Sequence, residues 1–383
     1  MKKTLALLTD IVKGEVTGAP LSLSPLSLDE AKALFRLSKR HELAHIVGNA
    51  VCREGVLTDA QARAAFEKES FTALYRYEML ERELASLSSL FEKARLAFMP
   101  LKGAVLRGFY PTPWMRNSCD IDILVKGEEL ETARALLLEN GYVGVGEGTH
   151  DVSFTSATGV HLELHYRLIE ERILSDAAKI LNDPWKHAHP VRDGAYRYEM
   201  TDAAFYLYHI VHMAKHYLLG GCGIRPFLDL WVLNHLVPHD SAARAALLAH
   251  AKLTDFARVS ESLSEAWFAG AAHSPVTEEM EQFVLVGGVY GNVENRVFIQ
   301  QAKEGGKLRY ALSRIFIPYE NLKIYYPVLK KHKWLLPVCH VRRWWRLVFC
   351  GRFQRSMREF HVNASRSAED AEKTALHLKD LGF

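Results

Sequence analysis

Residues 116–125 read R-N-S-C-D-I-D-I-L-V and give the clearest indication of local structure in the chain. Its apolar second half is typical of a buried β-strand. Because alternate side chains of a strand share a face, Asp120 and Asp122 are predicted to project together while Ile121 and Ile123 point into a core. Two carboxylates held that close repel one another unless a cation lies between them, and hard oxygen ligands suit Mg²⁺ or Mn²⁺. The stretch therefore predicts a strand that carries a candidate metal site.

A third carboxylate follows on a second predicted strand. Residues 151–155 (DVSFT) and 160–164 (VHLEL) are separated by S-A-T-G, which predicts a β-hairpin. On the second of these strands, Glu163 shares a face with His161 and His165. Three carboxylates on neighbouring strands are the equipment for two-metal phosphoryl transfer. For each carboxylate taken alone, an exposed strand residue without a metal stays an open alternative.

A glycine turn lies upstream of the acidic strand. Leu101, Lys102 and Gly103 follow a short apolar run and precede a helix-like segment, A-V-L-R-G-F-Y. A glycine in such a turn lets backbone N–H groups approach a phosphate closely. Arg116, four residues before Asp120, could neutralise a phosphate beside the metal.

Histidines form a further group of candidates. His209, His212 and His216 are spaced i, i+3 and i+7, so a helix would place them on one face. A metal-dependent phosphohydrolase could use such a set, and hydrogen-bonded core histidines are the alternative. The polar residues that could line a cleft beside the carboxylates are His150, His161, His165, His209, His212, Lys215, His216 and Asp229.

The remaining chain is predicted to be largely helical. Residues 28–53 and 59–95 are each predicted to be a helix, and the second has apolar positions at helical spacing with Asp59 as a candidate N-cap. Five further helices are predicted between 201 and 287, and Pro226 is expected in the first turn of one of them. The expected class is α+β, with a small mixed-sheet core flanked by N-terminal helices and a C-terminal helical domain. The expected regions are an N-terminal helical region 1–96, an α/β core 97–183, a helical domain 184–305 and a basic, aromatic-rich helical segment 306–383.

The net charge of +3 conceals a division along the chain. Residues 306–358 contain thirteen basic residues and one acidic residue, which leaves −9 for the rest. This balance excludes a uniformly basic nucleic-acid wrapper. Ten aromatic residues are interleaved with the cations, so the segment could bind phosphates or nucleic acid through charge and stacking. Alternatively, its helices bury their aromatics while Lys and Arg reach solvent. The basic residues are Lys307, Arg309, Arg314, Lys323, Lys330, Lys331, Lys333, Arg342, Arg343, Arg346, Arg352, Arg355 and Arg358.

Cysteine usage and hydropathy bear on the compartment. The five cysteines (Cys52, Cys119, Cys222, Cys339 and Cys350) are scattered and form no CxxC pair, so neither a disulfide framework nor a thiolate zinc site is indicated. No window reaches about 18 uninterrupted apolar residues. A cytoplasmic protein that does not span a membrane is expected.

Taken together, L-K-G at 101–103, R-N-S-C-D-I-D-I-L-V at 116–125 and H-L-E-L-H-Y at 161–166 resemble the nucleotidyltransferase fold of the DNA polymerase β superfamily. Within it, they resemble a bacterial group of uncharacterised nucleotidyltransferases. The likeness is close over residues 97–168 and looser through 209–229 and 326–342. Superfamily relatives usually have Gly-Gly or Gly-Ser at the turn, where this chain has Lys102 and Gly103.

The resemblance implies an enzyme that moves a nucleoside monophosphate from an NTP such as ATP to a hydroxyl group and releases pyrophosphate. It implies that Asp120 and Asp122 bridge two Mg²⁺ (or Mn²⁺) ions, and that Glu163 binds the ion nearer the acceptor and orients or deprotonates its hydroxyl. The residues implied to steady the triphosphate are Lys102, Gly103 and Arg116. The acceptor, a small molecule, a protein or RNA, stays open. So does a non-catalytic regulatory protein that holds a nucleotide or nucleic acid on the same fold.

Overall fold

The computed structural model describes residues 1–170, 173–349, 353–365 and 367–383. The chain divides into two compact units, of which the first comprises Met1–Lys215 and Gly223–Glu281 and the second His216–Cys222 and Gln282–Phe383. The expected α+β class is confirmed: a small mixed sheet is preceded and followed by helices along the chain. Cys350 and Arg352 lie outside the described residues, as do the side chains of Phe353 and Arg355.

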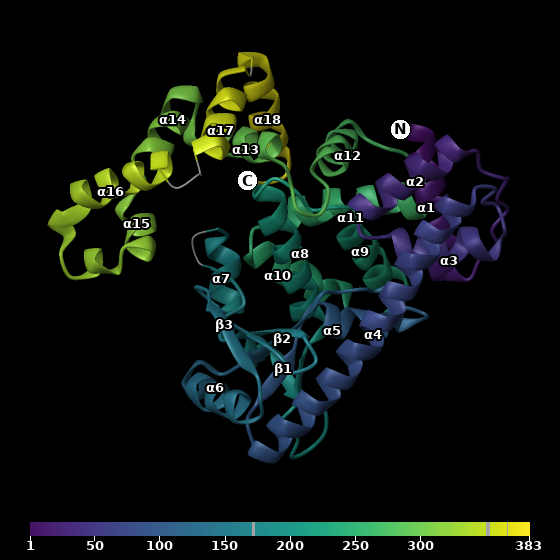
Figure 1. Ribbon diagram of the computed structural model, residues 1–383, viewed down its shortest axis with the longest axis horizontal. Coiled ribbons are helices and arrows are strands. Elements are labelled where there is room, and N and C mark those ends of the chain that lie inside the picture. Colours follow the sequence, from purple (N-terminus) through teal and green to yellow (C-terminus); the bar gives the residue numbers. More distant parts are fainter. Residues whose placement is uncertain (171–172, 350–352, 366) are drawn as a thin grey trace. The chain divides into compact units, whose positions relative to one another are not determined.

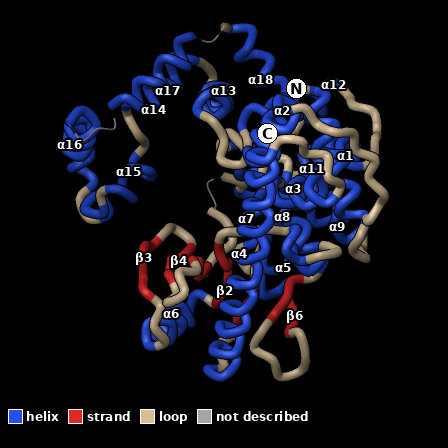
Figure 2. The backbone as a smooth tube through the Cα atoms, turned by 45° about the vertical axis from the view of Figure 1, so that its right-hand side comes forward, coloured by secondary structure: helices blue, strands red, loops and turns tan. Residues whose placement is uncertain are grey.

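A five-stranded sheet is the centre of the first unit (Figures 1 and 2). Its strand order is β1-β2-β5-β4-β3, and the pair β2–β5 is parallel while the other neighbours are antiparallel. Asp122 lies opposite Glu163 in the parallel pair. The strands are β1 (Phe98–Pro100), β2 (Asp120–Val125), β3 (Val143–Glu147), β4 (Asp151–Thr155) and β5 (His161–His165).

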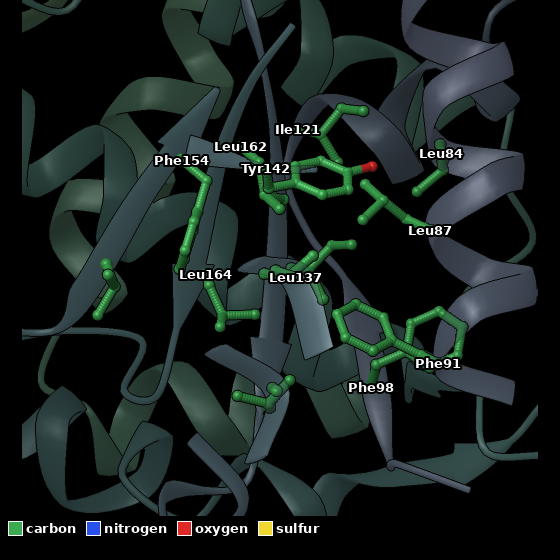
Figure 3. Close-up of a cluster of buried hydrophobic side chains, with 14 of the residues drawn as sticks. Leu84, Leu87, Phe91, Phe98, Ile121, Leu137, Tyr142, Phe154, Leu162 and Leu164 are labelled. Atoms are coloured by element: carbon green, nitrogen blue, oxygen red, sulfur yellow. The ribbon is translucent and has the colours of Figure 1, made fainter. Parts of the chain in front are cut away.

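One face of this sheet packs against two helices, α4 (Ala60–Ala94) and α6 (Leu130–Glu139). The apolar half of each alternating strand faces them, and Figure 3 shows Ile121, Leu162 and Leu164 with Leu87 and Phe91 of α4. Asp59 caps α4 by accepting a hydrogen bond from the N–H of Ala62 (2.8 Å). Because this face is closed by the helices, the polar half of each strand lies on the opposite face.

The sequence identified most of these strands but not all. The predicted hairpin is confirmed, since β4 and β5 pair through a turn at residues 156–159. The edge strand β3 was not predicted, because V-G-V-G-E has two glycines and all five residues are exposed. The short pair β6 (Ala188–Pro190) and β7 (Tyr198–Met200) was also missed, since three-residue strands carry little periodicity.

Helices make up the rest of the first unit. The single helix predicted over 28–53 is wrong: it is two helices, because Glu42 adopts a φ of +57° between them and its carboxylate pairs with Arg225. Pro226 lies in the first turn of α9, where the N–H group that proline lacks is not needed. The helices are α1 (Lys2–Thr17), α2 (Leu28–Arg40), α3 (Ala44–Arg53), α5 (Gly103–Leu106), α7 (Ser175–Leu181), α8 (Asp202–Leu218), α9 (Arg225–His235), α10 (Ser241–His250), α11 (Thr254–Phe268) and α12 (Pro275–Gly287), and the division between the units falls inside α8 and α12.

The second unit is helical in the part that the structure describes. Glu359 pairs with both Arg296 (2.6 Å) and Arg314 (2.8 Å), and a small core forms around Val297, Tyr310 and Val362. None of the described helices of the whole chain is long and apolar enough to cross a membrane. The helices of this unit are α13 (Val293–Glu304), α14 (Lys307–Ile315), α15 (Tyr319–Tyr325), α16 (Leu336–Phe349), α17 (Phe353–Ser365) and α18 (Ala368–Asp380).

Candidate functional site

The polar face of the sheet carries the predicted acidic residues. Its side chains come from alternate positions of three paired strands, so they form rows on one surface. Asp122 on β2 pairs with Glu163 on β5, and Glu163 pairs in turn with Ser153 on β4. Asp120, two residues before Asp122 on β2, pairs with His161 on β5. The alternation read from the sequence therefore places the carboxylates on one face, as predicted.

Asp122 is the centre of the contacts on this face. The Lys102 ammonium lies 2.6 Å from Asp122 Oδ1 and 3.8 Å from Glu163 Oε2. The Nε2 atom of His165 lies 2.8 Å from Asp122 Oδ1 and 3.3 Å from Glu163 Oε2. The Asp122 side chain is only 4% exposed, whereas Glu163 is 28% exposed. Glu163 is thus the carboxylate that a substrate would reach more easily.

These contacts set the charge state of the cluster. Burial alone would raise the pKa of Asp122, but Lys102 and His165 outweigh it and hold that pKa well below its usual range. Burial alone would lower the pKa of Lys102, but the Asp122 carboxylate outweighs it and the pKa is raised. The pKa of His165 is raised because its hydrogen bonds to Asp122 and Glu163 exceed the effect of burial. Lys102 and Asp122 are therefore both ionised.

Asp120 behaves in the opposite way. Burial and the negative charge of Asp122 together raise the pKa of Asp120 to about 6, although the charge of Lys102 opposes them. Asp120 and Asp122 thus lie on one strand face near the single ammonium of Lys102, which pairs with Asp122. A further cation near Asp120 would favour its ionised form.

The turn between β1 and α5 is shaped by two unusual positions. Lys102 adopts a φ of +44°, a left-handed conformation in which residues other than glycine are strained. Gly103 has no room for a side chain, since a Cβ would lie 2.9 Å from the Cβ of Ser118. Arg107 fixes this packing by donating to the Gly103 carbonyl and to the Ser118 hydroxyl (2.9 Å each). The predicted glycine turn therefore lies directly beside β2.

Arg116 and Asp229 lie elsewhere than on the polar face. The Arg116 Nε donates to Asp229 Oδ1 (2.6 Å), and the hydroxyl of Tyr110 donates to the same oxygen (2.8 Å). Asp229 is fully buried and Arg116 is 7% exposed. The sequence led us to expect that Arg116 would contact a phosphate. In the structure its guanidinium is instead paired with a carboxylate, which already neutralises its charge. The pair instead ties the loop before β2 to α9.

The predicted histidines separate into two groups. The ring of His150 lies 5.7 Å from the ring of His165, and His161 Nε2 lies 3.9 Å from Glu163 Oε1, so both border the acidic cluster. His209 instead contacts the Pro226 carbonyl (3.0 Å) and is buried between α8 and α9. His212 lies beside the Tyr208 ring, and His216 belongs to the second unit.

Helix α8 supplies two side chains to the surroundings of the cluster. Burial lowers the pKa of Lys215, and after burial the charges of Glu170 and Lys102 have the largest effects on that pKa. Burial raises the pKa of Tyr208, on which the charges of Lys102 and Asp122 also act. Lys215 was a sequence candidate, but Tyr208 was missed. Its one signal was its position four residues before His212 on the same helix face.

The residues present fit a divalent cation. Asp122, Glu163 and His165 offer ligand atoms within 4.8 Å of one another, and among the described residues they are the one group of three or more such side chains that do so. The two carboxylates are the donors that Mg²⁺ and Mn²⁺ prefer. No such group forms around His209 and His212 in the described part of the chain, so the geometry gives no support to a histidine phosphohydrolase centre.

Comparisons with known proteins give the family. The model of a family described as uncharacterised nucleotidyltransferases matches residues 27–269, which include the acidic cluster, the glycine turn and α8. No curated protein and no solved structure matches the chain. The matched residues are more than half of the sequence and indicate nucleotidyl transfer in general terms. The chain belongs to the uncharacterised nucleotidyltransferase family.

Proposed function

We propose that the protein transfers a nucleoside monophosphate from an NTP, with ATP as the first to test, to a hydroxyl acceptor and releases pyrophosphate. The observation that carries this proposal is the parallel register of Asp122 and Glu163 beside the Lys102–Gly103 turn. Family membership supports the general reaction class. We also propose that the protein works in the cytoplasm, because its five cysteines are scattered along the sequence and form no CxxC pair.

The residues of the acidic cluster would have separate roles in the reaction. Asp120, Asp122 and Glu163, with His165 beside them, would hold Mg²⁺ or Mn²⁺, which when bound neutralises triphosphate charge and favours an acceptor alkoxide. Glu163 is the more exposed carboxylate and would accept the proton of the acceptor hydroxyl. The acceptor oxygen bonds to the α-phosphorus, the bond from that phosphorus to the bridging oxygen breaks, and pyrophosphate leaves with the electron pair. Lys102 and the N–H groups at Gly103 would steady the triphosphate.

The test is incubation of the purified chain with each α-labelled NTP and Mg²⁺, followed by a search for label on the protein, on RNA and on small molecules. We expect Mg²⁺-dependent pyrophosphate release that Asp122→Asn and the double variant Asp120→Asn/Asp122→Asn reduce by at least about a thousandfold. Glu128→Gln, an exposed carboxylate just beyond β2, is the control and should leave turnover unchanged. Undiminished turnover in the double variant would rule out the proposed site.

A second candidate function comes from the second unit. Part of its aromatic set is exposed rather than packed, with Trp334, Trp345 and Phe349 all more than 60% exposed. Arg342 and Arg346 are exposed on α16, the helix that also carries Trp345 and Phe349. Exposed rings among cations are the features that bind single-stranded nucleic acid by stacking and charge. We therefore propose RNA as the partner of this surface, either as the acceptor or as the ligand of a non-catalytic binding protein.

A further inference from the structure

The ammonium of Lys102 already pairs with the carboxylates that could hold a divalent cation. Its Nζ is 2.6 Å from Asp122 Oδ1 and 3.8 Å from Glu163 Oε2, and both carboxylates belong to the group that could hold a metal ion. A Mg²⁺ ion binds carboxylate oxygens at about 2.0–2.1 Å. An ion bound to these carboxylates would therefore be a near neighbour of the ammonium, and their like charges would repel one another in a site that is largely shielded from water.

The conformation of Lys102 also indicates a purpose other than holding the fold together. The residue keeps a φ of +44° in a turn where glycine would be free of strain. Its partner Asp122 lies on the polar face of the sheet, away from the apolar core that α4 and α6 close. The Lys102 side chain is still 24% exposed, so its flexible stem can turn away from Asp122 without crossing that core.

We propose that Lys102 is an exchangeable counter-ion: it neutralises Asp122 and Glu163 when no divalent cation is bound, and it must leave them before the cation can bind. The triphosphate of the incoming nucleotide, which would lie beside the same turn, is the anion that receives it. This inference rests on the proposed function. Because Lys102 competes with the metal ion, metal binding is weak in the absence of nucleotide. The two ligands are coupled, since the triphosphate draws Lys102 away from the carboxylates and the metal ion releases Lys102 to the triphosphate.

The inference is tested by Mn²⁺ binding, measured by electron paramagnetic resonance on the full chain without nucleotide. Lys102→Met should bind Mn²⁺ at least about tenfold more tightly than the unmodified protein, because the competing charge is gone. Lys102→Gln gives a second neutral side chain in case one variant folds poorly. Lys102→Arg should keep the weak affinity, since it keeps the charge. Lys93→Met, an exposed lysine at the end of α4, is the matched control and should change nothing.

A non-reactive α,β-methylene NTP analogue separates this inference from the proposed function. In the unmodified protein the analogue should tighten Mn²⁺ binding strongly, and in Lys102→Met it should do so much less. Equal nucleotide-free Mn²⁺ affinities in the two neutral variants and the unmodified protein would overturn the counter-ion role while leaving the metal site intact. Failure of every variant to bind Mn²⁺ even with the analogue would overturn the proposed function itself.

Discussion

Asp120 and Asp122 show how strongly position decides the state of a side chain. Both lie on one face of β2, yet the pKa of Asp120 is raised to about 6 by burial and by Asp122, while the pKa of Asp122 is lowered by Lys102 and His165. The difference arises because a single ammonium reaches one of them at 2.6 Å. Without a metal ion, Asp120 is the member of the pair that opposes folding.

The stability of two variants tests this assignment. The folded pKa of Asp120 lies above its unfolded value of about 3.9, so the folded form holds its proton more tightly and loses stability as pH rises from about 4 to 6. Asp120→Asn should therefore stabilise the metal-free protein by about 1–2 kcal/mol above pH 6 and by little below pH 4. Asp122→Asn should destabilise it by about 3 kcal/mol, because Lys102 loses its partner.

Urea unfolding in the presence of EDTA, at neutral pH and near pH 4, measures both effects. A loss of stability in Asp120→Asn at neutral pH would contradict the raised pKa. The Glu128→Gln variant again provides the baseline, since this side chain is exposed and follows the C-terminal end of β2, whereas Asp120 lies at the start of that strand.

Among the elements of the first unit, β2 is held in place by a buried ion pair between the loop that precedes it and α9. Arg116 lies in that loop, four residues before β2, and pairs with Asp229 of α9, with Tyr110 on the same carboxylate oxygen. Both charges are almost completely buried, so each depends on the other for neutralisation. The start of β2, where Asp120 lies, is thereby fixed relative to α9.

Removing one member of this pair should be costly. Asp229→Asn leaves the Arg116 guanidinium buried without a counter-charge, and we expect a loss of about 3–5 kcal/mol in the free energy of unfolding. The double variant Arg116→Met/Asp229→Leu should recover part of that loss, since apolar side chains need no partner. Denaturant titration of the three proteins measures the coupling. Equal losses in the single and double variants would show that the pair is not what stabilises this junction.

The elements that the sequence predicted are those with a local signal. The alternation in D-I-D-I-L-V and the S-A-T-G turn indicated β2, β4 and β5, and the spacing of apolar residues indicated α4. The pairing of Arg116 with Asp229 joins residues 113 positions apart and leaves no trace in local spacing. Tyr208 was missed for the same reason, because its role depends on which face of α8 meets the sheet. The edge strand β3 has no buried face and hence no pattern.

Along the full sequence, the basic segment lies outside the residues that match the family. The match ends at residue 269, and the basic segment 306–358 lies wholly beyond it, within the second unit. The aromatic residues of that segment differ in burial: Tyr310 is buried in a small core, whereas Trp345 is 61% exposed on α16. The acidic cluster and the basic segment 306–358 therefore lie in different parts of the chain.

RNA binding by the full-length protein tests the second unit directly. We expect a labelled single-stranded RNA to bind with an affinity that falls linearly in a log–log plot as salt rises. Arg342→Ala/Arg346→Ala should make that slope shallower by about 0.7 for each phosphate that the two arginines neutralise. Trp345→Ala should cost about 1–3 kcal/mol if a base stacks on that ring. The control is Lys379→Ala, an exposed cation on α18. No binding at low salt would exclude RNA as the partner of this surface.

The strained backbone of Lys102 has a consequence for how this protein would evolve under selection. A residue other than glycine at a φ of +44° costs the folded chain on the order of 1 kcal/mol. Replacing Lys102 with glycine would relieve this strain, but it would also leave the buried Asp122 carboxylate without its ammonium, a loss of about 3 kcal/mol. In a library randomised at this single codon, selection for heat resistance should therefore retain a cationic residue even when turnover is not selected.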